Sequence, residues 1–303
     1  YQVPGLNLRG GLLFAGANGL PRGAFDLDKN NFQPRAGIAY KVLSNKPLVF
    51  RGGAGLYYLP TVEYGGVVGF ARTTTAQTST PDFLPFHTLS NPFPNGLIPR
   101  PGAEEGMKTQ VGDSISFNDS ARRVPRVWQY SAGFQYEFLP GILAEATYVG
   151  SDSRQLQVSR SISYLTPEQL ALGTPFLNQV VPNPFYNVLP VTTARGAQPT
   201  IQRRNLLTQY PHFSGVTAGQ LNLGSSWYHS VQFKLEQRFK SGLTYLVSYT
   251  VSKTMEAVAF RNAQDSFLSR ELTTFDTPQR LVVSGYYEFP IGPKKQYLSK
   301  GLL

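Results

Sequence analysis

The sequence contains no cysteine, which excludes disulfide bonds and metal sites built from thiolates. It also lacks an unbroken run of the roughly 18 or more apolar residues that marks a transmembrane helix. Charged residues are sparse, at 15% of 303 positions. These absences argue against membrane-spanning helices but leave open a membrane protein built from strands, because alternating strands keep the mean hydropathy low.

Residue patterns for catalysis or metal binding are also missing. His87, His212 and His229 stand far apart, and no two have the spacing of metal ligands. The glycines of residues 52–55 lack the Gly-Lys-Ser/Thr ending of a phosphate loop. Gly-Asp-Ser at residues 112–114 resembles an esterase nucleophile block, but no apolar strand precedes it, so we interpret it as a turn. We therefore expect no enzyme activity, no cofactor and no metal.

The formal net charge of +10 raises the question of a nucleic-acid partner. Lysine and arginine are scattered singly or in pairs, such as Arg122-Arg123 and Arg203-Arg204, and form no long basic patch. The charge therefore indicates a solvated basic surface, and no nucleic acid is expected as a partner.

Residues 227–251 carry the clearest pattern in the sequence, two alternating arms joined at 240–242. Side chains on a strand point to opposite faces in turn, so the alternation predicts a β-hairpin with one apolar and one polar face. The first arm, 227–239, is longer than the about five or six residues of an ordinary strand and matches the about nine to eleven that cross a bilayer. Its apolar parity consists of Trp227, His229, Val231, Phe233, Leu235 and Phe239.

Further ranges show the same alternation. None of the apolar-parity positions in these predicted strands is Asp, Glu, Lys or Arg, whereas the other parity carries charges. A lipid-facing wall with a wet lumen explains both facts. A soluble two-layer sandwich, whose apolar face packs on a second sheet, is the alternative. The additional strands are predicted at residues 35–42, 48–58, 128–138, 142–150 and 280–289.

The predicted connections alternate between short and long. Short turns lie at residues 44–46, 139–141 and 240–242. Long, aperiodic segments lie at 59–126, 151–226 and 254–279, and the second should contain a short helix with Thr166 as N-cap and Pro167 in the first helical position. Outer-membrane barrels combine short periplasmic turns with long extracellular loops, so we expect the turns at one end of the sheet and the loops at the other.

The fold class expected is all-β: a sector of an antiparallel, up-and-down transmembrane β-barrel with long extracellular loops. The predicted strands are too few and odd in number to close a bacterial barrel alone. The lumen-facing residues would be Arg35, Lys41, Arg51, Glu137, Glu145, Lys234, Glu236, Arg238, Arg280 and Glu288. The aromatic girdle would consist of Trp128, Phe138, Trp227, Phe239, Tyr287 and Phe289. Lys234, Glu236 and Arg238 should form a ladder with adjacent strands, for example with Glu145 or Thr250.

Several blocks of sequence resemble the barrel of Oar-like TonB-dependent outer-membrane receptors, which carry a carboxypeptidase-regulatory-like domain ahead of a plug. The resemblance implies that residues 1–303 belong to one β-barrel domain, within a barrel of about 22 strands. The blocks are GGLLFAG at 10–16, DKNNFQPRAGIAY at 28–40, FRGGAGLYY at 50–58, RVWQYSAGFQ at 126–135, YVGS at 148–151, VPNPFY at 181–186, YTVSK at 249–253 and FDTPQRLVVS at 275–284.

This resemblance implies a location in the outer membrane of a Gram-negative cell, surrounded by lipid, and energy supplied by the TonB complex through a plug segment. The plug and the N-terminal domain would lie outside the 303 residues, and both ends of the sequence are expected to be cuts. The function expected is capture of a ligand by the loops and its import through the lumen. A structural or adhesive barrel contacting surface proteins or filaments is the alternative, and an unplugged porin is a third. The sequence does not identify the ligand.

Overall fold

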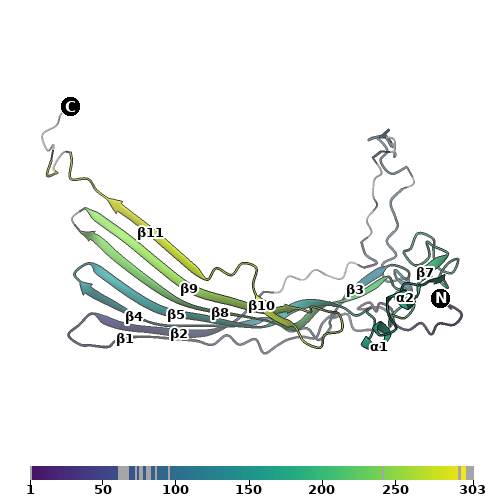
Figure 1. The fold of residues 1–303 in the computed structure, drawn as a ribbon, viewed down its shortest axis with the longest axis horizontal. Helices are drawn as coiled ribbons and strands as arrows, with labels where there is room; N and C mark the ends of the chain where they lie inside the picture. Colours follow the sequence, from purple (N-terminus) through teal and green to yellow (C-terminus); the bar gives the residue numbers. More distant parts are fainter. Residues whose placement is uncertain are drawn as a thin grey trace.

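The structure, a computed structural model, describes residues 2–60, 68–71, 74, 78–79, 83–85, 87–94, 96–240, 242–292 and 295–297 (Figure 1). Its main feature is a nine-stranded sheet, long and curved, from whose one end the described loops project. Most of the sheet is an antiparallel meander in which the long strands pair in the order in which they follow one another along the chain. This arrangement agrees with the all-β, antiparallel fold predicted from the alternation.

The meander is formed by six strands in the order β1-β2-β4-β5-β8-β9. Beyond β9 the sheet divides, because β11 pairs with the first half of β9 and β10 with the second half. Strand β3 is the exception to the antiparallel rule and pairs in parallel with the start of β8. The bounds are β1 Arg35–Lys41, β2 Leu48–Tyr58, β3 Ser114–Asn118, β4 Arg126–Leu139, β5 Ile142–Ser161, β8 Gly215–Lys240, β9 Leu243–Ala259, β10 Ser269–Leu272 and β11 Gln279–Tyr287.

Short elements occupy the long connections. Helix α1 begins where the sequence predicts it: the Thr166 side chain accepts a hydrogen bond from the Gln169 amide, and the Gln169 side chain accepts one from the Thr166 amide. This reciprocal capping box satisfies amides that a helix start otherwise leaves unpaired. The elements are η1 Gly106–Lys108, α1 Pro167–Leu170, α2 Thr174–Leu177, β6 Val180–Pro182, β7 Thr200–Gln202 and η2 Arg203–Asn205.

The two ends of the sheet differ in the length of their connections. The hairpins close at Leu139↔Ile142 and Lys240↔Leu243, and both turns lie at the left end of the sheet in Figure 1, together with the β1–β2 turn. We call this the turn end. The described parts of the long connections leave from the opposite end, which we call the loop end. The predicted separation of short turns from long loops is confirmed.

Two of the long loops are shorter than the sequence pattern suggests. Residues 151–161 continue β5, 215–226 begin β8 and 254–259 continue β9. Along β5 and β8 the register shifts after Arg154, Leu156 and Val158, and Gln155 adopts a positive φ of 60°. Each irregularity moves the following side chains out of step, so the period of two that identifies a strand in sequence is lost. The predicted loop ranges 151–226 and 254–279 are therefore corrected.

The pairing register keeps the two faces of the sheet separate from β1 to β11. Residues paired across strands point to the same face, so each set of partners forms a row. One continuous row is apolar throughout and consists of Tyr40, Phe50, Phe134, Ala146, Phe233, Tyr249 and Leu281. The adjacent row is mostly polar and consists of Lys41, Val49, Gln135, Glu145, Lys234, Ser248 and Val282.

We call the face that carries the first row the apolar face and the other the polar face. Large side chains on the apolar face are exposed, with 50% of Phe134, 48% of Phe233 and 64% of Leu281 accessible. An exposed apolar surface of this extent marks contact with a membrane or another protein.

The main hydrophobic core of the described residues lies at the loop end, where β3 and the start of β8 contribute Ile115 and Val216 to it. Segments distant in sequence contribute to it, including Phe185 and Phe213, which are almost fully buried. We call this cluster the loop-end core. Its members are Val3, Leu12, Val111, Ile115, Phe185, Leu189, Phe213 and Val216. The described loops therefore pack as a unit with its own interior.

Substitution of Gly150 tests how the apolar face is packed. A Cβ atom on Gly150 would lie 2.4 Å from Cε2 of Tyr130, because this ring covers the glycine from the neighbouring strand. We expect Gly150→Ala to destabilise the full-length protein by about 1 to 3 kcal/mol in a lipid refolding titration, since the ring must move. The double variant Gly150→Ala/Tyr130→Ala should lose less than the two single variants summed. Gly37→Ala, where the nearest atom is 3.5 Å away, is the control.

Candidate functional site

The residues predicted to face a lumen lie on the polar face or next to it. Arg35 and Lys41 are on β1, Arg51 on β2, Glu137 on β4, Glu145 on β5, Lys234 and Glu236 on β8, and Arg280 on β11. Glu288 follows the last residue of β11, which ends earlier than predicted, at Tyr287. Arg238 lies in β8, but its side chain is outside the described part of the structure.

On the part of the polar face near the turn end, the structure brings Glu145, Lys234 and Glu236 together. Glu145 is the cross-strand partner of Lys234, and Nζ of Lys234 lies 2.9 Å from Oε2 of Glu236 in an ion pair along one strand. Glu145 also accepts a hydrogen bond from the Thr147 hydroxyl. The expected neighbour Thr250 is opposite Gln232 instead, and Ser248 is opposite Lys234. The ladder thus combines charges with hydroxyl and amide groups, which suits a water-facing wall.

Three other charged residues of the predicted set stabilise the turn end. Nζ of Lys41 donates to the Ser44 carbonyl at 2.9 Å, and the Gly141 amide donates to Oε1 of Glu137 at 2.8 Å. Glu288 forms an ion pair with Lys295. These contacts connect residues at the turn end to one another. The three charged side chains therefore stabilise the chain there.

The two tryptophans of the sequence fall into one row of the sheet. Trp128 on β4 and Trp227 on β8 are both partners of Asp152 on β5, so they lie at the same height on the apolar face. The guanidinium of Arg270 lies 4.5 Å from the Trp227 ring centroid and that of Arg154 lies 5.1 Å from it. Amphipathic rings combined with charges are typical of the border between hydrocarbon and water.

The remaining predicted girdle residues lie towards the turn end. Phe138 is the residue before the end of β4, and the Tyr287 and Phe289 rings pack edge to face with centroids 5.2 Å apart. Phe289 follows β11, and the Phe239 side chain is outside the described residues. The predicted girdle residues thus lie in two groups, the tryptophan row and the group near the turn end. Along β8 the apolar residues Val231, Phe233 and Leu235 lie between them.

A polar contact on the apolar face was not predicted. The Tyr148 hydroxyl lies 2.7 Å from Nδ1 of His229, and the Tyr130 ring packs beside Tyr148 with centroids 6.2 Å apart. His229 lies on the apolar face, two residues from Trp227 along β8. The hydrogen bond satisfies both polar groups, which lowers the cost of placing them near hydrocarbon.

At the loop end, Asn183 organises the connection that it belongs to. Its Nδ2 donates to the carbonyl oxygens of Arg195 at 2.8 Å and Gln198 at 2.7 Å, while its Oδ1 accepts from the Phe185 amide at 3.0 Å. This side chain closes the loop from 183 to 198 and positions the buried Phe185 ring. The VPNPFY block noticed in the sequence therefore has a structural role as the centre of a folded loop.

Arg195 and His212 continue this network into the loop-end core. The Arg195 guanidinium donates Nε and Nη2 to the Phe213 carbonyl at 3.2 and 3.0 Å. Nε2 of His212 is 3.1 Å from the Gly10 carbonyl and connects the N-terminal segment to the core. Burial lowers the pKa of His212, the Gly10 carbonyl opposes this shift, and the positive charge of Arg195 adds to it. His212 is therefore neutral near pH 7, with the proton on Nε2.

The described residues offer no group of three or more His, Asp or Glu side chains that could hold a metal ion. Within the same part of the chain, no helix is long and apolar enough to cross a membrane. Sequence reasoning missed the loop-end network of Asn183, Arg195 and His212, for which the VPNPFY block was the one available signal.

Comparisons with known proteins place these features in a family. A family model described as "Outer membrane beta barrel domain" matches residues 2–303. None of the curated proteins compared with the chain matches it. Among solved structures, the chain is similar to the outer membrane transporter YddB from Escherichia coli, with 9% identity and a TM-score of 0.35. The match covers 73% of this chain and 19% of the transporter, so the chain spans about a fifth of that protein's length.

The pKa of His212 predicts that the loop-end core weakens in acid. The unfolded chain takes up a proton below the ordinary histidine pKa of about 6.5, whereas the folded state resists protonation to lower pH. Stability is therefore complete above that pH and falls as the pH drops towards the lowered pKa. After correction for intrinsic rates, hydrogen exchange in residues 10–14 should be faster at about pH 5.5 than at about pH 7.5. His212→Gln should reduce this pH dependence, while His229→Gln should retain it.

Neighbouring residues of β9 allow a test of the two faces. Val247 is on the apolar face and Ser248 on the polar face. Val247→Arg should destabilise the full-length protein in bilayers by about 2 to 4 kcal/mol if the site is near the midplane, because an arginine would enter hydrocarbon. Ser248→Arg should cost much less. Equal losses in a lipid refolding titration would contradict the assignment of faces.

Proposed function

This chain belongs to the outer-membrane β-barrel domain family and is located in the outer membrane, and we propose that it forms a wall sector of an energised, plugged import receptor. In this function, the loop end binds a ligand outside the cell and the polar face lines the path through the barrel. The TonB complex supplies energy through a plug segment, as the resemblance to Oar-like receptors implies. No catalytic step, metal or cofactor is part of the proposal.

The observation that carries this proposal is the structure of the sheet. Its strands pair in one continuous register, one face is apolar and the other polar, and the outer strands have unpaired edges. In the described sheet, β1 has β2 as its partner and β11 has β9, so one side of each outer strand is unpaired. An unpaired strand edge in hydrocarbon leaves amides and carbonyls without partners, so the wall requires further strands. The family resemblance suggests a barrel of about 22 strands, which is wide enough to hold a plug.

The polar face supports a lumen that contacts a plug. Lys234, Glu236 and Glu145 form a charged cluster on this face near the turn end, where an inner domain would contact the sheet. Charged side chains are favourable there if water or a polar partner solvates them. The same ladder would also suit a water-filled pore, so this observation fits the third alternative, an unplugged porin.

The loop end supports ligand capture because its described segments are folded. The Arg160 guanidinium donates from Nη2 to the carbonyls of Ala263 and Asp265 at 2.8 and 2.7 Å, and stacks on Phe260 with 4.4 Å to the ring centroid. It thereby attaches the β9–β10 connection to β5. Short turns of outer-membrane barrels face the periplasm, so this folded unit would face the exterior.

A structural or adhesive barrel is the second candidate. It is favoured by apolar side chains exposed on the N-terminal segment and on the long connection after β2: 81% of Leu27, 91% of Phe83 and 99% of Leu89 are accessible. Exposed apolar groups can contact surface proteins or filaments, which would be the partners in this function.

Single cysteines provide the test, because the chain has none of its own. Ser248→Cys places a thiol on the polar face, and Val247→Cys is the matched control facing lipid. Both variants of the full-length protein are exposed in intact cells to a small, membrane-impermeant maleimide, with TonB present or deleted. For a plugged import receptor we expect slow labelling at position 248 that depends on TonB, and little labelling at 247.

The alternatives give different results. Rapid labelling at position 248 without TonB dependence, together with a steady conductance in planar bilayers, would show an open porin and overturn the import proposal. Slow labelling that is unchanged without TonB would favour the structural or adhesive barrel. Equal labelling at 247 and 248 would contradict the assignment of these positions to opposite faces of the sheet, on which all three functions depend.

A further inference from the structure

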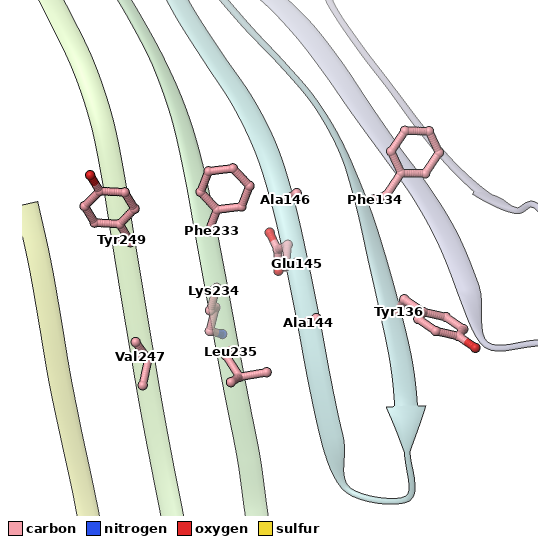
Figure 2. A pocket seen from close by; sticks show the side chains of 10 residues that line it. All are labelled: Phe134, Tyr136, Ala144, Glu145, Ala146, Phe233, Lys234, Leu235, Val247 and Tyr249. Carbon is pink, nitrogen blue, oxygen red and sulfur yellow. The ribbon is translucent and has the colours of Figure 1, made fainter. Parts of the chain in front are cut away.

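A groove of about 410 Å³ crosses the apolar face near the turn end (Figure 2). Ala144 and Ala146 of β5 form its floor. Phe134 and Tyr136 of β4 form one side, and Phe233 and Leu235 of β8 form the other. Val247 and Tyr249 of β9 extend the second side. The volume lies within the range of about 300 to 1,000 Å³ that is typical of small-molecule sites.

The pairing register explains the shape of the groove. Tyr136, Ala144 and Leu235 share one row, and Phe134, Ala146 and Phe233 share the next row on the same face. In both rows, a small side chain on the middle strand stands between two large ones. Because strands in a sheet are about 4.8 Å apart, the flanking strands are separated by about 10 Å. The result is a narrow channel along β5.

The charged residues beside the groove belong to the opposite face. Glu145 and Lys234 border it, but they occupy the polar parity of β5 and β8. Lys234 is engaged with Glu236, and Glu145 accepts a hydrogen bond from Thr147. The side chains that point into the groove are therefore apolar, with the Tyr136 and Tyr249 hydroxyls as their polar atoms.

We propose that this groove binds one acyl chain of a phospholipid from the leaflet nearest the turn end. Family membership places the apolar face in contact with membrane hydrocarbon, and the groove is continuous with that contact. A flexible, unbranched chain fits a narrow apolar channel with no charged group, and it restores van der Waals contacts that an empty channel would lose.

The position of the groove along the strands indicates which leaflet supplies the acyl chain. Ala144 follows the turn at Gly141 by three positions, so it lies about 10 Å along the strand from that turn. The apolar band of an outer-membrane barrel is about 25 Å tall. The floor of the groove thus lies in the half of the membrane adjacent to the turns, which is the periplasmic half. The proposal depends on location in the outer membrane and not on import.

Photo-crosslinking tests this proposal. The full-length protein is delipidated in mild detergent and given about one equivalent of a phosphatidylethanolamine with a diazirine in the middle of one acyl chain. After illumination, we expect labelled peptides from β4, β5 and β8 around the groove, and unlabelled phosphatidylethanolamine should compete. Ala146→Phe fills the floor and should reduce this labelling about tenfold, a loss on the scale of a few apolar contacts in a binding site.

Ala132→Phe is the matched control, because Ala132 is on the apolar face of β4, next to Tyr148, and does not line the groove. It should leave the labelling unchanged. Ala144→Leu provides a second, smaller filling substitution if Ala146→Phe does not fold. Labelling spread evenly along the apolar face, or equal labelling in the filled and control variants, would overturn the proposal. A failed import test would leave this result unaffected, because the import test follows position 248 on the polar face.

Discussion

The structure depends on backbone hydrogen bonding between antiparallel strands in one continuous register. In hydrocarbon each amide and carbonyl needs a partner within the protein, so a membrane wall can be built from strands only when neighbours pair along their whole length. The register from β1 to β11 meets this requirement within the sheet. It also places side chains of like polarity in common rows. The apolar row through Phe134, Ala146 and Phe233 and the polar row through Glu145 and Lys234 are therefore two consequences of one pairing pattern.

These rows connect the fold with its proposed function. The apolar face is suited to lipid, and its border is marked by Trp128 and Trp227 in one row. The polar face presents an ion pair between Lys234 and Glu236, next to Glu145. Where two large side chains flank an alanine in successive rows, the same register produces the groove to which we assign an acyl chain. Membrane contact and the proposed roles in the lumen and in lipid binding thus depend on one pairing pattern.

The loop end is stabilised mainly by burial of apolar side chains and not by continuous strand pairing. Its segments have no alternating pattern, and they gain stability by burying Phe185 and Phe213 in a separate core. Asn183 and Arg195 satisfy backbone carbonyls around this core, which lowers the cost of burying irregular chain there. His212 adds a sensitivity to acid, because its buried ring favours the neutral form. In the proposed function, this folded unit would supply the surface that binds a ligand or a protein partner.

The sequence by itself determined the features that depend on local pattern. Alternation identified the strands between the short turns, the two faces and the end at which the turns lie, and the helix start with Thr166 as N-cap and Pro167 after it was readable from adjacent residues. Only the tertiary structure decided where β5 ends and where β8 begins, since bulges near Gln155 remove the period of two. It also decided that Lys41, Glu137 and Glu288 form contacts in the turn regions and that Asn183 closes its own loop. The same holds for the contact of His212 with the distant Gly10 and for the position of Ala144 and Ala146 between large neighbours. These outcomes depend on contacts between remote segments, which the local periodicity of a chain does not encode.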